Sequence, residues 1–342
     1  MTSDKLICDA HLDLAWNALH TGRDLTQPLD PVSGALTSLP ALGAAGVGVV
    51  CATLFAEPAD AWLGPVVDGY RTPEEAERQA LEMLALYREW EAGGAVRIVT
   101  GRASLEAHLA RFPEDAVPGL LLLIEGADPI VAVDDLADWW ERGVRMIGLA
   151  WGPTRYAGGT GSTAGLSPLG AELLEAMAEL RVIHDASHLS EEAFAAALPL
   201  PHHALCVTHA TARALMTARP GRIPFNRFLS DQQIRAVAER DGVIGLALLN
   251  DFLVPGWGAG DPPVTLAADA AAHLRHLAGI AGWERVGIGS DVDAGHGRAE
   301  TPLELGSVAD WPRVGDIAPP EARAGVLGGN WVRFLRAALP AE

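Results

Sequence analysis

The sequence predicts an α/β fold, a (β/α)8 barrel of the TIM type. Apolar runs rich in β-branched residues alternate with segments of helical periodicity along the 342 residues, and eight such runs can be distinguished. The runs are continuously apolar, which is typical of parallel strands covered on both faces. No linker rich in Ser, Gly or Pro divides the chain, so we expect residues 1–342 to form a single barrel domain with a C-terminal helix. A doubly wound open sheet is the alternative architecture.

The predicted strands are eight apolar segments spread along the chain. They are Lys5–Asp9, Gly46–Phe55, Leu120–Glu125, Arg145–Ala150, Arg181–Asp185, Ala204–Thr208, Val243–Leu249 and Val286–Ser290. Val96–Thr100 is a further candidate, which we expect outside the main sheet because it is short and lies between two helices.

The helices between the strands carry recognisable start signals. Thr72 offers an N-cap, Pro73 takes the first helical position, and Glu75 completes a capping box. The other predicted helices are Asp134–Arg142, Pro168–Leu180, Glu191–Leu198, Asp231–Arg240, Leu266–Ile280 and Pro319–Leu339. We expect the last of these to pack across the sheet or the outside of the barrel. The Pro- and Gly-rich stretch Val254–Val264 is expected to be a loop that walls the active site.

Composition excludes several classes of protein. Lys and Arg total 25 against 44 Asp and Glu, a formal charge of -19, so the basic footprint of a nucleic-acid-binding protein is missing. Cys8, Cys51 and Cys206 are widely spaced in apolar runs, which indicates reduced core residues. No signal peptide and no apolar run of about 20 residues is found, so we expect a cytoplasmic protein without a membrane span.

Polar side chains of metal-binding type stand at the ends of five predicted strands. His11 and Asp13 are one residue apart at the end of the first strand and therefore project to the same side. The other strand ends carry Glu125, the Asp185-Ala-Ser-His188 stretch, His209, and the pair Asp291 and Asp293. In a barrel of this type these ends meet at one rim, where the chemistry resides.

This ligand set suits a divalent metal. A single such residue is usually a helix cap, a salt-bridge partner or a hydrogen-bonded structural histidine, but histidines and carboxylates crowded on one rim need a cation between them. Nitrogen and oxygen ligands without thiolates suit Zn²⁺, with Mn, Co or Fe as substitutes. One carboxylate shared by two ions would form a two-metal hydrolase centre, with the ions about 3.5–4 Å apart.

The ordered set of motifs resembles the membrane (renal) dipeptidase family of zinc peptidases, including its bacterial members. The motifs are Asp9-Ala-His-Leu-Asp13, Ile124-Glu-Gly126, Gly143-Val-Arg-Met-Ile-Gly-Leu-Ala-Trp151, Asp185-Ala-Ser-His-Leu-Ser190, Val207-Thr-His209, Arg227-Phe-Leu-Ser-Asp231, Gly242-Val-Ile-Gly245, Gly289-Ser-Asp-Val-Asp293 and Leu327-Gly-Gly-Asn-Trp331. They cover nearly the whole chain in the order of the family.

The resemblance implies a (β/α)8 barrel with a binuclear zinc centre and a homodimer. In it, His11 and Asp13 match the ligands of one metal, and His188 and His209 match those of the other. Glu125 matches the bridging carboxylate. Asp291 matches the acidic residue that handles protons at the scissile bond, and Arg227 matches the arginine that receives the terminal carboxylate of the substrate. Asp293 is expected to support the loop.

One position departs from the family pattern. The strand near Arg145 ends in Trp151, where the dipeptidases typically have a histidine that contacts the reacting substrate. Trp151 can form an apolar wall or lid, or it can simply pack in the barrel mouth. Tyr156 and Arg155 follow closely and are candidates to replace the missing donor.

The sequence thus predicts a metal-dependent dipeptidase that hydrolyses the amide bond of small dipeptides through a metal-bridging hydroxide. The alternatives are another metal-dependent amide or lactone hydrolase of the same barrel type and a non-catalytic, metal-stabilised binding protein.

Overall fold

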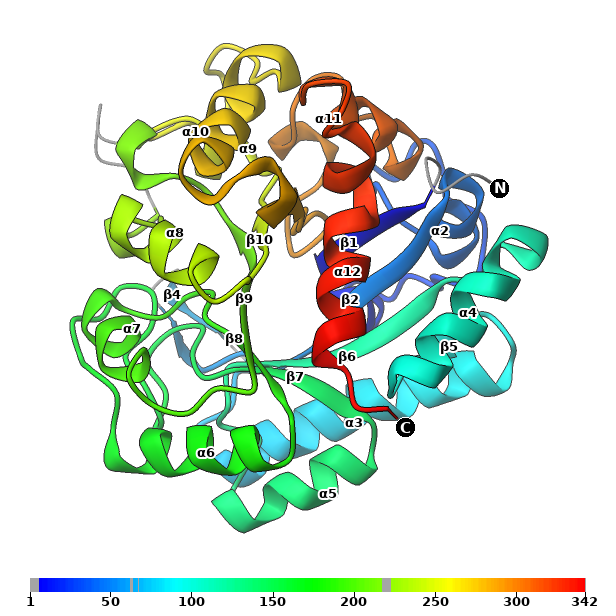
Figure 1. Ribbon diagram of the computed structural model, residues 1–342. Coiled ribbons are helices and arrows are strands. Elements are labelled where there is room, and N and C mark those ends of the chain that lie inside the picture. Colours follow the sequence, from blue (N-terminus) through cyan, green and yellow to red (C-terminus); the bar gives the residue numbers. More distant parts are fainter. Residues whose placement is uncertain (1–5, 62–63, 67, 217–222, 342) are drawn as a thin grey trace.

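A closed ring of eight parallel strands forms the centre of the molecule (Figure 1). The computed structural model describes residues 6–61, 64–66, 68–216 and 223–341. The ring consists of β1 (Ile7–Leu12), β2 (Val47–Phe55), β6 (Gly119–Glu125), β7 (Val144–Gly148), β8 (Ile183–Asp185), β9 (Ala204–Ala210), β10 (Ile244–Leu246) and β11 (Val286–Ile288). It closes because β2 pairs with both β1 and β6, and β1 pairs with β11. The (β/α)8 prediction is confirmed, and Lys5 of the first predicted strand lies outside the described residues.

A ninth short strand corrects one expectation. β5 (Arg97–Ile98) pairs in parallel with Gly119 and Leu120 of β6, so the stretch Val96–Thr100 is not separate from the main sheet. Pairing of β6 with β7 begins only at Leu122, so β5 occupies the part of that edge which β7 leaves open. A separate antiparallel pair is formed by β3 (Asp60–Ala61) and β4 (Gly64–Pro65).

Helices surround the ring. They are α1 (Leu14–Thr21), α2 (Leu39–Ala45), α3 (Pro73–Ala92), α4 (Arg102–Asp115), α5 (Leu136–Glu141), α6 (Pro168–Glu179), α7 (Glu191–Ala197), α8 (Asp231–Ala238), α9 (Asn250–Leu253), α10 (Ala271–Ala281), α11 (Pro312–Asp316) and α12 (Asn330–Ala338). Thr72 caps α3 as predicted, because its side chain accepts a hydrogen bond from the N–H of Glu75. A large apolar core joins the helices to the outer face of the ring.

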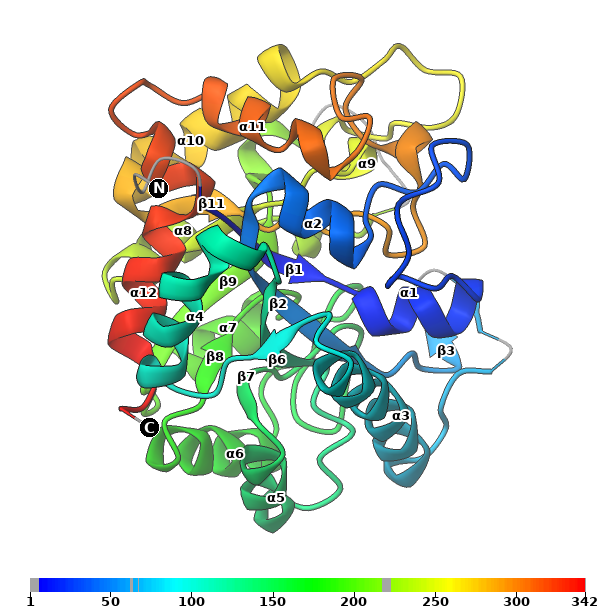
Figure 2. The same cartoon turned by 90° about the vertical axis from the view of Figure 1, so that its right-hand side faces the viewer.

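α12 closes one end of the barrel. Trp331 and Leu335 pack with Val49, Leu121 and other residues near the starts of the strands, and Figure 2 places α12 on the side opposite α1. The indole N–H of Trp331 donates to the carbonyl of Ile288 at 3.0 Å. Of the two expected placements, the outside of the barrel is wrong, because apolar residues of α12 cover the interior layer that the strands leave open at this end.

The strand register aligns the carboxyl ends of the strands at the other end of the barrel. Phe55, Glu125, Gly148, Asp185 and Cys206 are consecutive register partners across β2, β6, β7, β8 and β9. Their Cα atoms therefore lie side by side around the ring, and the segments that follow them leave from the same rim.

Candidate functional site

Three histidines and three carboxylates converge at the rim where the strands end. Their ligand atoms fall into three overlapping groups, each within 4.8 Å: His11, Asp13 and Glu125; Glu125, His188 and His209; and His11, His209 and Asp291. All six side chains are buried. The structure thus brings together the five predicted metal ligands and Asp291.

Glu125 lies between two sets of imidazoles. Its Oε2 is 3.4 Å from Nε2 of His11, and its Oε1 is 3.2 Å from Nε2 of His188. The same Oε1 is 3.7 Å from Nε2 of His209. One carboxylate therefore presents one oxygen to each set, which is the arrangement a bridging ligand needs.

Two residues of the cluster have unusual backbone conformations. His188 has φ of 65° and Asp291 has φ of 61°, and Gly126, directly after Glu125, has φ of 78°. Non-glycine residues rarely adopt positive φ, and such positions concentrate at functional sites. Each turn redirects the chain at the end of its strand, so that the side chain faces the rim.

A buried hydrogen-bond network orients two of the imidazoles. The hydroxyl of Thr208 lies 3.2 Å from Nδ1 of His11 and 3.0 Å from Nδ1 of His209. Since that hydroxyl donates its only proton to Asp185, it can only accept from the two rings. In the neutral form of each ring, Nδ1 then carries the proton and Nε2 faces the cluster with its lone pair.

The carboxylates of the cluster act on the protonation of His11. Burial opposes protonation of His11, but the carboxylates of Glu125, Asp13 and Asp291 raise its pKa to about 10. Burial lowers the pKa of His188 to about 3. Of the three imidazoles, His11 is thus the one that holds a proton against the carboxylates.

The carboxylates respond to the same crowding. Burial, and then the charge of Glu125, raises the pKa of Asp13 to about 6. Burial also raises the pKa of Asp291 to about 8, with Asp13 and Glu125 adding to the shift. Burial opposes ionisation of Glu125 too, but His11 and His188 hold its pKa below the usual range.

The residues present fit one or two divalent cations. Nε2 of His11 is buried and has no hydrogen-bond partner. Nε2 of His188 and Nε2 of His209 face each other at 2.9 Å, which places two nitrogen ligands beside one oxygen of Glu125. Imidazole and carboxylate donors without thiolate are the set preferred by Zn²⁺ and its first-row substitutes.

Arg227 packs against His209 of this cluster, outside the residues that line the pocket, and its Nε is an unpartnered donor. It is buried, its guanidinium donates to the carbonyl of His209 at 3.0 Å, and its Nε has no partner. Its Cζ lies 5.1 Å from the ring centroid of Phe252, which lines the pocket above the cluster. Burial lowers the pKa of Arg227, and the charges of Asp291 and Glu125 oppose that shift.

The pocket above the cluster has a volume of about 200 Å³ and largely apolar walls. It is lined by Asp13, Trp16, Phe55, Glu57, Glu125, Trp151, His188, His209, Ile223, Leu249, Phe252, Asp291, Ala294, Gly295 and His296. Trp151 takes part in the wall, with its ring 5.1 Å from that of Phe55 and 6.1 Å from that of His188.

Tyr156 and Arg155, the two candidates to replace the missing donor, do not line the pocket with Trp151. Tyr156 is fully buried outside the pocket lining, and its hydroxyl donates to the carbonyl of Ile130. Arg155 is also committed elsewhere, since its guanidinium donates to the carbonyls of Ile130 and Val131. The structure therefore does not bring Tyr156 into contact with a substrate in this pocket.

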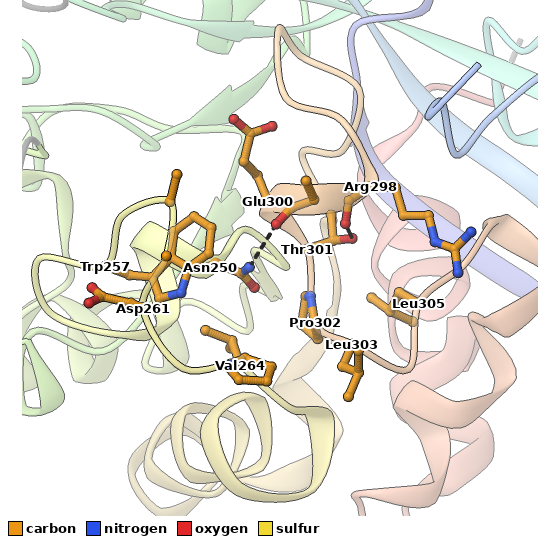
Figure 3. A pocket seen from close by; sticks show the side chains of 14 residues that line it. Asn250, Trp257, Asp261, Val264, Arg298, Glu300, Thr301, Pro302, Leu303 and Leu305 are labelled. Atoms are coloured by element: carbon orange, nitrogen blue, oxygen red, sulfur yellow. Dashed lines mark hydrogen bonds between the residues drawn. The ribbon is translucent and has the colours of Figure 1, made fainter. Parts of the chain in front are cut away.

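Figure 3 shows a second cavity, of about 450 Å³. Both cavities contact α9, because Phe252 of this helix lines the first and Asn250 lines the second. Trp257 and Val264 belong to the loop that was expected to wall the active site, and they wall this second cavity instead.

A family model and individual relatives identify the family of this chain. The family model described as membrane dipeptidase, peptidase family M19, matches residues 1–340. The chain belongs to the membrane dipeptidase family. A relative from Klebsiella pneumoniae, an uncharacterized protein in the pqqA 5′ region, is 32% identical over 75% of this chain and 94% of its own length. A dipeptidase of Aspergillus oryzae is 26% identical over 50% of this chain, and that match spans 38% of the fungal protein.

Peptidases of known structure share the fold. A metallopeptidase from Rhodobacter sphaeroides, solved with a phosphinate mimic of L-Ala-D-Ala, superimposes with a TM-score of 0.80 over 97% of this chain and 99% of its own, at 22% identity. The probable dipeptidase PvdM from Pseudomonas aeruginosa also gives 0.80, over 97% of this chain and 95% of its own, at 19% identity. Within the part of the chain that the structure describes, no helix has the length and apolar character of a transmembrane segment.

Proposed function

We propose that this membrane dipeptidase family member is a binuclear metal-dependent dipeptidase. The observation that carries the proposal is the position of Glu125, with one oxygen toward His11 and the other toward His188 and His209. His11 and Asp13 would hold one ion, His188 and His209 the other, and Glu125 both. Zn²⁺ is the ion we expect, because the donors are imidazoles and carboxylates only.

Two such ions would supply a hydroxide at neutral pH and polarise the amide carbonyl. The chain supplies the remaining functions. Asp291 stands beside both metal sets, 3.9 Å from Nε2 of His11 and 3.9 Å from Nε2 of His209, where it would accept a proton and pass it to the leaving amine. Arg227 would bind the terminal carboxylate of the substrate, for which its unpartnered Nε supports it.

The test is a substrate panel with the purified chain loaded with Zn, Mn or Co. L,L- and L,D-dipeptides are compared with N-acyl amino acids and lactones, and bound metal is counted. We expect dipeptide cleavage and two ions per chain. Cleavage of N-acyl amino acids or lactones alone would assign the barrel to another hydrolase class. Two bound ions with no turnover of any substrate would assign a binding role.

Trp151 is the observation that favours the second hydrolase class. The indole N–H can donate a hydrogen bond but does not ionise near neutral pH, so a substrate that needs a proton donor at this wall would turn over slowly. A homodimer and a cytoplasmic location stay predictions, and size-exclusion chromatography with light scattering would test the first.

A further inference from the structure

One acidic side chain of the pocket has no part in the metal cluster. Glu57 follows the end of β2 and lines the pocket together with Phe55, two residues before it. Thr53, a further two residues back, donates to Asp13. In an extended chain, residues two apart point to the same side. This face of β2 therefore contacts Asp13 at Thr53 and reaches the pocket wall at Glu57.

Glu57 is a partly buried carboxylate of the pocket wall. It is half-buried, and among the residues that the structure describes no basic side chain forms an ion pair with it. Burial raises its pKa, and the nearby His20 and Trp16 oppose that shift only in part. A carboxylate that lines a ligand pocket without an ion pair gains from a cationic ligand.

Aromatic rings stand next to this carboxylate. Trp16 and Phe55 line the same pocket with ring centroids 6.4 Å apart, and Phe55 in turn contacts Trp151. A carboxylate beside aromatic faces is the chemistry that recognises organic ammonium groups, through an ion pair and cation–π attraction.

The two charged groups beyond the metal ligands lie on different sides of the cluster. Glu57 is on the β2 side, where Thr53 contacts Asp13, whereas Arg227 donates to the backbone of His209 in β9. Arg227 is not among the residues that line the pocket, so the recognition of an ammonium group there would rest on Glu57 alone. An N-acylated ligand would meet Glu57 with a neutral group.

We propose that Glu57 forms the ammonium-binding subsite of the pocket and selects substrates that carry a free amino group. This assignment rests on the proposed function, because it names the substrate class of the same pocket. The ammonium group can be the α-amino group of the first residue or the side-chain amine of a lysyl residue, and both present the same chemistry to Glu57.

The experiment uses the zinc-loaded full chain and Glu57→Gln, a change that keeps the shape and removes the charge. One substrate pair is the best-cleaved alanyl dipeptide and its propionyl analogue, which lacks only the α-amino group. The other pair is the lysyl and norleucyl dipeptides. We expect Glu57→Gln to lower kcat/KM for the amine-bearing member on the order of 10- to 100-fold and to leave its partner within about twofold. The pair that responds identifies the source of the amine.

The matched control is Glu82→Gln, an exposed carboxylate on α3, which is expected to leave all four values unchanged. Metal content and thermal unfolding check that Glu57→Gln folds and loads zinc. An equal loss for all four substrates, or no loss for any, overturns the ammonium subsite. If the wild type cleaves nothing, the proposed function fails by itself. In that case calorimetric titration with the same four compounds tests the subsite. The subsite is supported if the wild type binds the amine-bearing compounds more tightly and Glu57→Gln loses this preference, and it is overturned if the preference is unchanged.

Discussion

The hydroxyl of Thr208 donates a 2.5 Å hydrogen bond to Oδ2 of Asp185 while facing the Nδ1 atoms of two imidazoles. Oδ1 of Asp185 accepts from the N–H groups of Ser187 and Thr208. Both carboxylate oxygens therefore act as acceptors. This arrangement fixes the tautomer of His11 and His209 through a side chain that touches no metal position.

We predict that Asp185→Asn weakens zinc binding by about 10- to 100-fold, the usual effect of losing such a support. The amide nitrogen of Asn would replace one of the two accepting oxygens of Asp185, so that an N–H group would face another hydrogen-bond donor. Zinc affinity is measured by competition with a chromophoric chelator. Thr208→Val should reproduce the loss and Thr208→Ser should retain affinity, whereas equal affinities in both Thr208 variants would contradict the role of the hydroxyl.

Arg227→Lys is predicted to lower kcat/KM for dipeptides by about 10- to 100-fold, since a point charge replaces a planar fork that suits a carboxylate. The loss should fall mainly on KM. Dipeptide amides, which lack the terminal carboxylate, provide the control. If they suffer the same loss, Arg227 acts through the buried contact with His209 and not on the substrate.

Trp151→Ala is predicted to shift side-chain preference. Removing the ring next to Phe55 enlarges a pocket of about 200 Å³. The ratio of kcat/KM for phenylalanyl over alanyl dipeptides should rise on the order of 10-fold, because filling apolar space contributes about 1–3 kcal/mol. Trp140→Ala, which alters an indole outside this lining, serves as the comparison, and an unchanged ratio in Trp151→Ala would remove Trp151 from substrate selection.

We predict that His184 makes the free energy of unfolding sensitive to acid. It is buried, neither ring nitrogen has a hydrogen-bond partner, and burial lowers its pKa to about 3. The unfolded chain, with a pKa near 6.5, binds the proton first, so the free energy of unfolding falls as pH drops from about 6.5 to 3. At pH 5 this loss is about 2 kcal/mol.

Urea unfolding at pH 8 and pH 5 measures the effect. His184→Leu should unfold with a smaller difference between the two pH values than the wild type, while His20→Gln, at an exposed histidine, should match the wild type. Identical differences in the wild type and His184→Leu would show that the proton is accommodated in the folded state.

The barrel was predictable because buried parallel strands leave continuous apolar runs, as in Leu120–Glu125, which forms most of β6. Helices were less visible. α1 follows directly after Asp13 without a side-chain cap, and α4 contains Pro113, so neither presents a standard signature. The position of α12 depends on which apolar surface remains uncovered, which is a property of the assembled fold.

The metal-type residues were predictable for a different reason. A polar residue at the end of an apolar run, such as Glu125, is placed by the period of the strand and by the common rim. The pocket walls carry no such marker, because Trp16 and Phe55 are ordinary apolar residues in sequence. Tyr156 shows the converse, since closeness to Trp151 along the chain did not determine the direction of its side chain.

The closure of the barrel by α12 has a kinetic consequence. The interior below the rim is filled from Val49 and Leu121 down to Trp331, so it provides no exit on that side. A molecule that occupies the pocket above Glu125 enters and departs through one mouth. The released fragments must therefore clear that mouth before the next molecule arrives, and each fragment is expected to act as a competitive inhibitor when it accumulates.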